Sequence, residues 1–232
     1  LLYFGQLKEG LALAKLAISL NPEDVNLWAL LAEAQINNKL FDDALLSIEK
    51  GKLINPLVSE LYFAEGSIYI SQNKKQKAKK SLEQGLKIQP KNTNALFQYG
   101  NIFLMEKNYK KALSKYNKII EIKANFWQAI NNKGLIYFEQ DAILLAINNF
   151  TKAIEIKKNA ESMLALGVSL KDTDKKKSIL LVKEALQKNP NYASFEFREE
   201  QLWGEKLQRA TEELFKLEEL KKDISIANLY KN

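Results

Sequence analysis

The sequence contains no cysteine and no histidine. These absences exclude disulfide bridges, thiolate nucleophiles, zinc sites of the cysteine and histidine kind, and imidazole as a general base. Only four prolines and nine glycines occur among 232 residues, too few for a long linker, a collagen-like repeat or a disordered chain. No apolar run approaches the roughly 20 residues that a membrane-spanning helix needs. The composition therefore indicates a folded chain without the reagents of most enzyme classes.

The reactive side chains that remain are carboxylates, lysines and tyrosines, and they form no recognisable catalytic arrangement. The acidic pair that comes nearest to such an arrangement is Glu139 with Asp141. They fall in a predicted turn between helices, and an exposed turn does not provide the enclosed surroundings that activate a catalytic carboxyl. We therefore expect no catalysis, and no cofactor, metal ion or small-molecule substrate.

Positive charge is concentrated in the middle of the chain. Residues 1–58 carry 5 basic and 7 acidic side chains, residues 59–190 carry 23 and 12, and residues 191–232 carry 7 and 9. The net charge is therefore +11 in the middle and −2 at each end. All the basic side chains are lysines except Arg198 and Arg209. Because planar recognition of phosphates and bases prefers arginine, this charge disfavours a nucleic-acid partner.

A 34-residue period runs through the sequence, and three residue types share it in different phases. They are Pro22, Pro56 and Pro90; Gly66, Gly100 and Gly134; and Ala44, Ala78, Ala112 and Ala146. Within each period, apolar residues recur at helical spacing in two runs, with a short polar stretch such as NNKLFD or MEKNYK between them. Each period therefore predicts two helices joined by a tight turn.

These residues resemble the tetratricopeptide repeat, whose pattern combines large apolar residues with small residues where its two helices approach. In residues 93–126 the pattern falls on Leu96, Gly100, Phe103, Ala112, Tyr116 and Ile119. The resemblance implies an all-α fold, namely a right-handed α-solenoid of antiparallel helix pairs. It also implies a protein that holds other proteins and is not itself an enzyme.

The repeat pattern divides the chain into three parts. Residues 1–22 resemble the second half of an earlier, truncated repeat. Residues 23–192 hold five repeats, at 25–58, 59–92, 93–126, 127–159 and 160–192. Residues 193–232 keep helical spacing but lose the pattern, which predicts a C-terminal helical cap. Because the last two repeats are each one residue short, we expect residues 158–178 to be the least stable region.

In this family the first helix of each pair lines a concave groove, so the resemblance implies that fixed positions on it face a protein client. In the third and fourth repeats these positions are Phe97, Gln98, Asn101, Leu104, Gln128, Asn131, Asn132, Leu135 and Phe138. Amides can hydrogen-bond the backbone of a bound peptide, and exposed aromatic rings supply contact area. The alternative is that Leu104, Leu135 and Phe138 pack between neighbouring repeats. The sequence thus predicts a scaffold that binds an extended or helical client segment here.

Two lysine clusters, within residues 74–80 and 107–118, support an alternative function. The chain would then be an electrostatic docking module for an anionic membrane surface or an acidic protein. Localisation is open between the cytoplasm and a membrane surface. The sequence begins with Leu1 and not with methionine, which also leaves open an anchor or targeting segment before it.

At the N-terminal end, Leu1, Phe4, Leu7 and Leu11 fall at helical spacing on the half-repeat. We expect this apolar stripe to lack a covering helix, and we therefore predict weak self-association through it. Separately, residues 126–140 and 200–211 are similar to tetratricopeptide-repeat proteins of cyanobacteria and chloroplasts. That similarity implies a role in assembling a photosynthetic complex.

Overall fold

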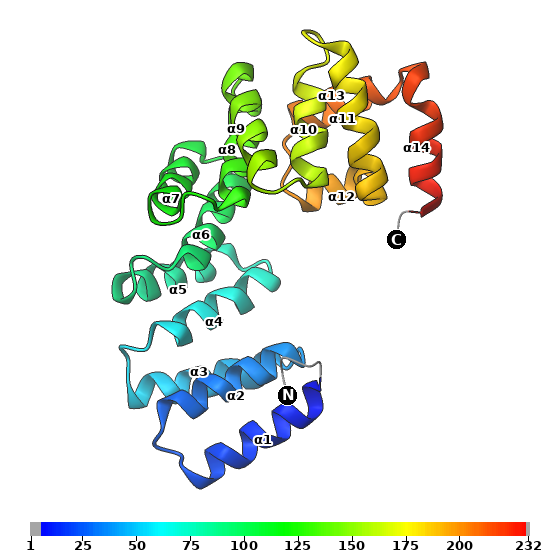
Figure 1. The fold of residues 1–232 in the computed structure, drawn as a ribbon. Coiled ribbons are helices and arrows are strands. Elements are labelled where there is room, and N and C mark those ends of the chain that lie inside the picture. The colour runs from blue at the N-terminus through cyan, green and yellow to red at the C-terminus, as the bar shows by residue number, and fades with distance from the viewer. Residues whose placement is uncertain (1–5, 231–232) are drawn as a thin grey trace. The chain divides into compact units, whose positions relative to one another are not determined.

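The structure is a computed structural model that describes residues 6–230, and the regular structure of this part is entirely helical (Figure 1). The described residues form fourteen α-helices and one short 3₁₀ helix, η2. Their bounds are α1 Leu7–Leu20, α2 Val25–Asn37, α3 Phe41–Ile54, α4 Ser59–Ser71, α5 Lys75–Ile88, α6 Thr93–Met105, α7 Tyr109–Ile122, α8 Trp127–Glu139, α9 Ile143–Ile156, α10 Ala160–Ser169, α11 Lys175–Lys188, η2 Pro190–Ala193, α12 Phe195–Glu200, α13 Glu205–Phe215 and α14 Glu218–Tyr230. The prediction of an all-α fold of antiparallel helix pairs is confirmed.

The chain folds as two compact units, Leu1–Ile102 and Phe103–Asn232. The boundary falls inside α6, between Ile102 and Phe103. The first unit holds α1 to α5 and most of α6, and the second holds α7 to α14.

Small residues allow consecutive helices to pair closely. Within the units, α2 packs on α3, α4 on α5, α8 on α9 and α10 on α11. The four alanines that share the 34-residue period are all fully buried. At Gly134 on α8, a Cβ atom would lie 2.5 Å from Cε1 of Phe150 on α9, so the ring can lie this close only to a glycine. The periodic small residues of the sequence therefore permit the close approach of the paired helices.

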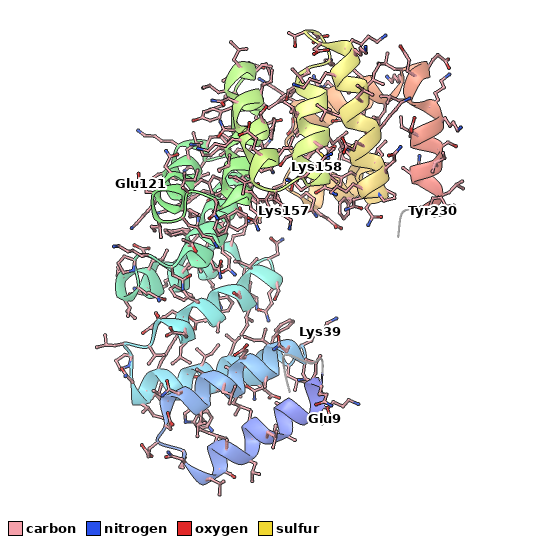
Figure 2. The ribbon with its side chains drawn as sticks, in the orientation of Figure 1. Glu9, Lys39, Glu121, Lys157, Lys158 and Tyr230 are labelled. Atoms are coloured by element: carbon pink, nitrogen blue, oxygen red, sulfur yellow. The ribbon has the colours of Figure 1, made fainter. Side chains whose placement is uncertain are left out.

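The turns inside the first four pairs share one backbone geometry. At the same place in each turn a residue other than glycine has a positive φ: Lys39 (59°), Asn73 (55°), Lys107 (56°) and Asp141 (61°). After α2, the Lys39 and Leu40 amides donate to the carbonyls of Ile36 and Gln35, which is the Schellman motif. Figure 2 shows the exposed Lys39 side chain directed away from the helices. Its positive φ therefore serves the turn and not a side-chain contact.

Helix α1 packs against α2, and this corrects one expectation about the N-terminal stripe. Leu11 contacts a cluster of buried side chains from the two helices, Ala14, Ile18, Leu31 and Ala34. The expectation that Leu11 lacks a covering helix is therefore wrong, because α2 covers it. Leu7 is half-buried, and Leu1 and Phe4 lie outside the described residues. Self-association through this end stays a prediction.

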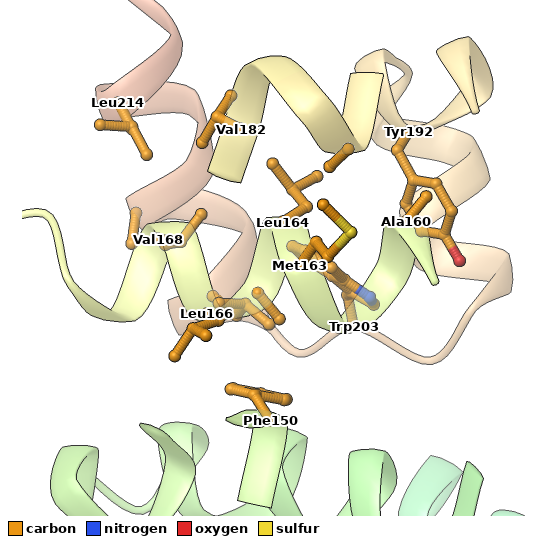
Figure 3. Packing of buried hydrophobic residues seen from close by; sticks show 14 of the residues in the cluster. Phe150, Ala160, Met163, Leu164, Leu166, Val168, Val182, Tyr192, Trp203 and Leu214 are labelled. Atoms are coloured by element: carbon orange, nitrogen blue, oxygen red, sulfur yellow. The ribbon is translucent and has the colours of Figure 1, made fainter. Parts of the chain in front are cut away.

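The C-terminal segment, defined here as residues 190–230, packs across several repeat helices. Helix α13 contacts α8 and α10, while α14 contacts α11 and η2. One hydrophobic cluster joins these elements, with Leu164 and Val168 of α10 lying among Tyr192, Trp203 and Leu214 of the segment (Figure 3). The segment therefore covers the first helices of the last two pairs, which is more than the predicted cap at the end of the array.

A buried arginine fixes the C-terminal segment internally. The Arg198 side chain is fully buried, and its Nε donates to Oε1 of Gln208 at 2.8 Å. One Nη atom donates to the Tyr192 carbonyl at 2.8 Å, and the other pairs with the Glu212 carboxylate. The guanidinium also lies 5.3 Å from the ring centre of Phe215. Arg198 thus ties η2, α12 and α13 together, and its role is structural.

Helix α10, which lies within residues 158–178, is almost completely buried. The expectation that this region is the least stable stays a prediction. Every residue of α10 except the half-buried Glu161 is buried. The helix packs against α9, α11 and α13. The missing residue of this repeat shortens α10 to 10 residues without exposing it. Burial therefore favours a stable α10, because the C-terminal segment compensates for the irregular repeat.

Candidate peptide-binding groove

A groove of about 550 Å³ lies between α2 and α4, the first helices of two consecutive pairs. Its lining residues are Asn26, Ala29, Leu30, Glu33 and Ile36 of α2, and Glu60, Leu61, Phe63, Ala64 and Ser67 of α4. We call this feature the α2–α4 groove. Most of these side chains are apolar, and Leu30 is 40% exposed. A folded chain without a partner leaves this apolar surface in water, so the groove is a candidate binding site.

Packing beneath the groove holds its walls in place. Leu61 is fully buried and belongs to a cluster that includes Ile48 and Ile68. The Phe63 ring lies over Gly85 of α5, where an added Cβ would come within 2.4 Å of Phe63 Cε1. The missing side chain at Gly85 thus provides the space for the ring. The groove is therefore built on packed side chains of two helix pairs, and its shape is preformed.

The edge of the groove carries negative charge. Glu33 on α2 and Glu60 on α4 are both exposed, and no lysine or arginine is among the lining residues. Two carboxylates beside an apolar surface create a negative potential that attracts cationic groups and disfavours anionic ones. The lining thus combines apolar contact area with selectivity for positive charge.

The predicted site residues of the third and fourth repeats divide into two groups. Four of them are half-buried: Phe97, Gln98, Asn101 and Gln128. Five are buried: Leu104, Asn131, Asn132, Leu135 and Phe138, each at most 7% exposed. The buried five cannot contact a client in this conformation, so the prediction of an open groove does not hold at their positions. The half-buried four stay predictions, and Gln98 shares a hydrogen bond with Ser67 on α4.

The two buried asparagines belong to an internal hydrogen-bond network. Asn131 Nδ2 donates to Oε1 of Glu161 at 2.8 Å, and Asn131 Oδ1 accepts from the Ser162 hydroxyl at 2.7 Å. Asn132 Nδ2 lies 3.3 Å from the Tyr116 hydroxyl and donates to it. Asn131 thus links α8 to α10, and Asn132 links α8 to α7. These hydrogen bonds give the two asparagines a structural role that the sequence did not reveal.

The α2–α4 groove has a covered counterpart in the second unit. Five groove residues of α2 have equivalents on α8, each 102 residues later in the sequence. The pairs are Asn26 and Gln128, Ala29 and Asn131, Leu30 and Asn132, Glu33 and Leu135, and Ile36 and Phe138. Four groove residues of α4 have equivalents on α10, each 101 residues later. The pairs are Glu60 and Glu161, Phe63 and Leu164, Ala64 and Ala165, and Ser67 and Val168. Seven of the nine later positions are buried, and none of the nine earlier ones is. The difference arises because α13 lies against α8 and α10.

Glu161 lies at the edge of this covered face. Its half-buried carboxyl accepts a hydrogen bond from Asn131 and lies beside Tyr192 and Trp203 of the C-terminal segment. Loss of hydration raises the pKa of Glu161 to about 7, although the hydrogen bond from Asn131 acts in the opposite direction. The carboxyl is therefore a structural group whose charge changes near neutral pH, and nothing reactive faces it.

The acidic pair Glu139 and Asp141 also has a structural role. The Leu207 amide, in the first turn of α13, donates to Oε1 of Glu139 at 3.0 Å. Gly204, at the N-cap of α13, has no side chain to supply this bond. Asp141 forms an ion pair with Lys206. The two carboxylates thus hold the start of α13 against the α8–α9 turn, through the favourable interaction of negative charge with a helix N-terminus.

Sequence reasoning selected positions on the first helices of the third and fourth repeats, whereas the α2–α4 groove uses equivalent positions in the first and second. The amides of α8 attracted attention because asparagine has no obvious packing role. The useful signal lay earlier in the chain, where Leu30 and Phe63 stand near Glu33 and Glu60 at the corresponding places. Nothing in the repeat pattern indicates that residues 190–230 cover α8 and α10. The open groove could therefore be located only from the structure.

Two segments, residues 59–92 and 128–159, match the family model of the tetratricopeptide repeat. The first contains α4 and α5, and the second contains most of α8 and all of α9. Together with the paired helices, these matches decide the fold. The chain has a tetratricopeptide-repeat fold.

Several solved tetratricopeptide-repeat and related structures are similar to this chain. YrrB, described as a TPR protein with an unusual peptide-binding site, is 19% identical; the match covers 77% of this chain and 93% of that chain, with a TM-score of 0.64. MamA (41-end) from Desulfovibrio magneticus RS-1 is 18% identical, with coverage of 70% and 93% and a TM-score of 0.63. PilF of Pseudomonas aeruginosa is 13% identical, with coverage of 89% and 97% and a TM-score of 0.62. At these identities the likeness shows the fold alone.

A comparison with curated proteins gave no match. Within residues 6–230, no group of three or more acidic side chains could hold a metal ion. No helix in the described part of the chain is long and apolar enough to cross a membrane. The α2–α4 groove is therefore the feature on which a functional proposal rests.

Proposed function

We propose that this chain is a non-catalytic scaffold that binds a segment of a client protein in the α2–α4 groove. The observation that carries the proposal is the open apolar lining of the groove, at positions whose counterparts in the second unit are covered by α13. Tetratricopeptide repeats are usually protein-binding scaffolds, and this chain offers such a surface already formed. The proposal names no particular complex. The predicted role in assembling a photosynthetic complex stays a prediction that no comparison supports.

The alternative of electrostatic docking has weaker support. Lys77 lies over the Tyr69 ring, and Lys111 lies over the Phe103 ring. Lys107 forms an ion pair with Glu205. Lysines that already interact with the chain's own side chains contribute less to a free basic surface. An anionic membrane or acidic protein therefore remains the second candidate.

A peptide selection on the purified chain tests the proposal. A random peptide library is selected on the wild type, and the affinities of the enriched peptides are then measured on the variant Leu30→Glu. Leu30 is partly exposed, so the variant should fold, but its charge removes apolar contact area from the groove. We expect the enriched peptides to lose about ten-fold or more in affinity, because a buried leucine contributes roughly 1.5–3 kcal/mol.

The matched control is Leu13→Glu, which changes an exposed leucine of α1 outside the groove lining. We expect the enriched peptides to bind this variant as they bind the wild type. Peptides that bind the Leu30→Glu variant as tightly as the wild type would place the binding site elsewhere and overturn the proposal.

A further inference from the structure

We infer that the client segment in the α2–α4 groove is an amphipathic helix that carries basic residues beside its apolar face. This inference rests on the proposed function and specifies the partner of the same groove. Its two parts, helical conformation and positive charge, come from different observations.

The helical conformation is inferred from the covered counterpart of the groove. There the chain places its own helix, α13, against α8 and α10. Leu207, Ala210 and Leu214 form one face of α13, and all three are buried in the cluster that contains Leu164 and Val168 (Figure 3). Spacings of three and four residues put these side chains on one side of a helix. The face formed by α8 and α10, the first helices of two consecutive pairs, thus accepts an amphipathic helix.

The α2–α4 groove offers the same kind of face. Its lining residues occupy the repeat positions that α13 covers in the second unit, and both faces consist of first helices from consecutive pairs. Leu30, Ile36 and Ala64 supply apolar surface that is not fully buried. Because an amphipathic helix buries one stripe of side chains in such a channel, it fits better than an extended strand, whose side chains alternate between two faces.

The charge of the client is inferred from the two exposed carboxylates of the groove, Glu33 and Glu60. In the covered face the counterpart of Glu33 is the apolar Leu135, so that face carries one carboxyl fewer, the half-buried Glu161. Burying two carboxylates under a neutral helix would remove them from water without compensation. A lysine or arginine at the edge of the apolar stripe would pair with them instead.

The corresponding helix of a second copy of this chain, α13, does not meet the charge requirement. Between Glu205 and Phe215, α13 carries two basic and three acidic side chains, a net charge of −1. Its apolar face is also buried in its own unit. The basic helices α5, α7 and α11 of a second copy already bury their apolar faces in the folded chain, so the groove favours a basic helix from another protein.

Designed peptides test both parts of the inference on the full chain. The parent peptide has the sequence of residues 203–217, which includes α13. The basic peptide carries Thr211→Lys and Glu213→Lys, which place one lysine on each flank of the apolar stripe. Binding is measured by fluorescence anisotropy with a label at the peptide N-terminus. We expect the basic peptide to bind at least about ten-fold more tightly than the parent, and to lose about ten-fold on the protein variant Glu33→Lys/Glu60→Lys.

Two controls separate specific binding from general attraction. The protein variant Glu83→Lys/Glu121→Lys makes the same change of charge at exposed residues outside the groove lining and should leave the affinity of the basic peptide unchanged. In the basic peptide, Ala210→Pro interrupts the helix and should weaken binding about 100-fold. These controls test charge position and helical conformation separately.

Specific outcomes overturn the inference. Undiminished binding of the proline peptide would show an extended client, and binding that ignores charge reversal at Glu33 and Glu60 would remove the basic requirement. No measurable binding of the basic peptide, while library peptides bind in a Leu30-dependent way, would also overturn it and would leave the proposed function intact. If no peptide depends on Leu30, the proposed function itself fails.

Discussion

Glu161 shows how one residue of the covered face links the helix pairs to the C-terminal segment. Its carboxyl accepts from Asn131 on α8 and lies beside Tyr192 of η2 and Trp203. Partial removal from water makes the charged form less favourable, which raises the pKa of Glu161 to about 7 from an ordinary value of 4.5. The folded chain therefore binds a proton here over a pH range in which the unfolded chain has already lost it.

This difference predicts how stability depends on pH. Between about pH 4.5 and 7 the folded state binds more protons at Glu161 than the unfolded state, so the contribution of this group to stability falls as the pH rises. The loss is complete above pH 7 and amounts to roughly 1–3 kcal/mol. This range follows from about 1.36 kcal/mol for each unit by which the pKa is raised, reduced because the carboxyl is partly exposed. Urea unfolding at pH 5 and pH 8 measures it, with Glu161→Gln as the variant that cannot ionise.

The Glu161→Gln variant keeps an acceptor for Asn131 and removes the titration. We expect it to lose less stability between pH 5 and pH 8 than the wild type does, since every other titrating group is common to both proteins. Equal losses in the two proteins would show that the Glu161 carboxyl stays hydrated in the folded state.

At the scale of single elements, the C-terminal segment depends on the buried Arg198. Its guanidinium satisfies the Gln208 side chain, the Tyr192 carbonyl and the Glu212 carboxylate at once. Truncation leaves the buried Gln208 oxygen and the buried Tyr192 carbonyl without a donor, which costs about 1–3 kcal/mol for each, while the half-exposed Glu212 carboxylate returns to water. We predict a destabilisation of about 3 kcal/mol or more for Arg198→Ala, measured by urea unfolding.

The other arginine of the chain provides the control for this prediction. Arg209 lies on α13 and is exposed, so Arg209→Ala should change stability by less than about 0.5 kcal/mol. Similar effects of the two substitutions would contradict the structural role of Arg198. A loss confined to Arg198→Ala would support it.

The elements differ in how far the sequence predicts them. The helix pairs and their turns follow from local patterns, because the periodic alanines and Gly134 mark the helix contacts and a polar stretch marks each turn. The packing of α13 on α8 and α10 joins residues that are far apart in the sequence, and no repeat pattern continues into residues 190–230. The buried state of Asn131 depends on this packing, and the role of Arg198 depends on contacts within residues 190–230, where no repeat pattern guides a prediction.

The burial of α10 illustrates the same limit. Its repeat is one residue short, which suggested a weak point in an array where each pair contacts mainly its neighbours. The structure adds α13 as a further neighbour, and only Glu161 of α10 is not fully buried. The shortened repeat is therefore also the one whose first helix, α10, packs against α13 from outside the repeat array.

At the scale of the whole molecule, two faces with the same repeat positions have different surroundings. In the first unit the α2–α4 groove is open, with apolar side chains beside Glu33 and Glu60. In the second unit the corresponding face of α8 and α10 is covered by the chain's own helix α13. One chain thus contains both an occupied and an open version of the tetratricopeptide-repeat face. The open version is the basis of the proposed client binding.

Thiol labelling at two equivalent alanines tests this account most directly. Ala64 of the groove is half-buried and its counterpart Ala165 is fully buried, and the chain has no cysteine of its own. The variants Ala64→Cys and Ala165→Cys therefore carry the same substitution at the same repeat position. Each is labelled with a small disulfide reagent, with and without the basic peptide, and each rate is normalised to the rate in denaturant. The account predicts that Ala64→Cys reacts at least about ten-fold faster and that the peptide slows only this variant; equal rates, or peptide protection at Ala165→Cys alone, would contradict it.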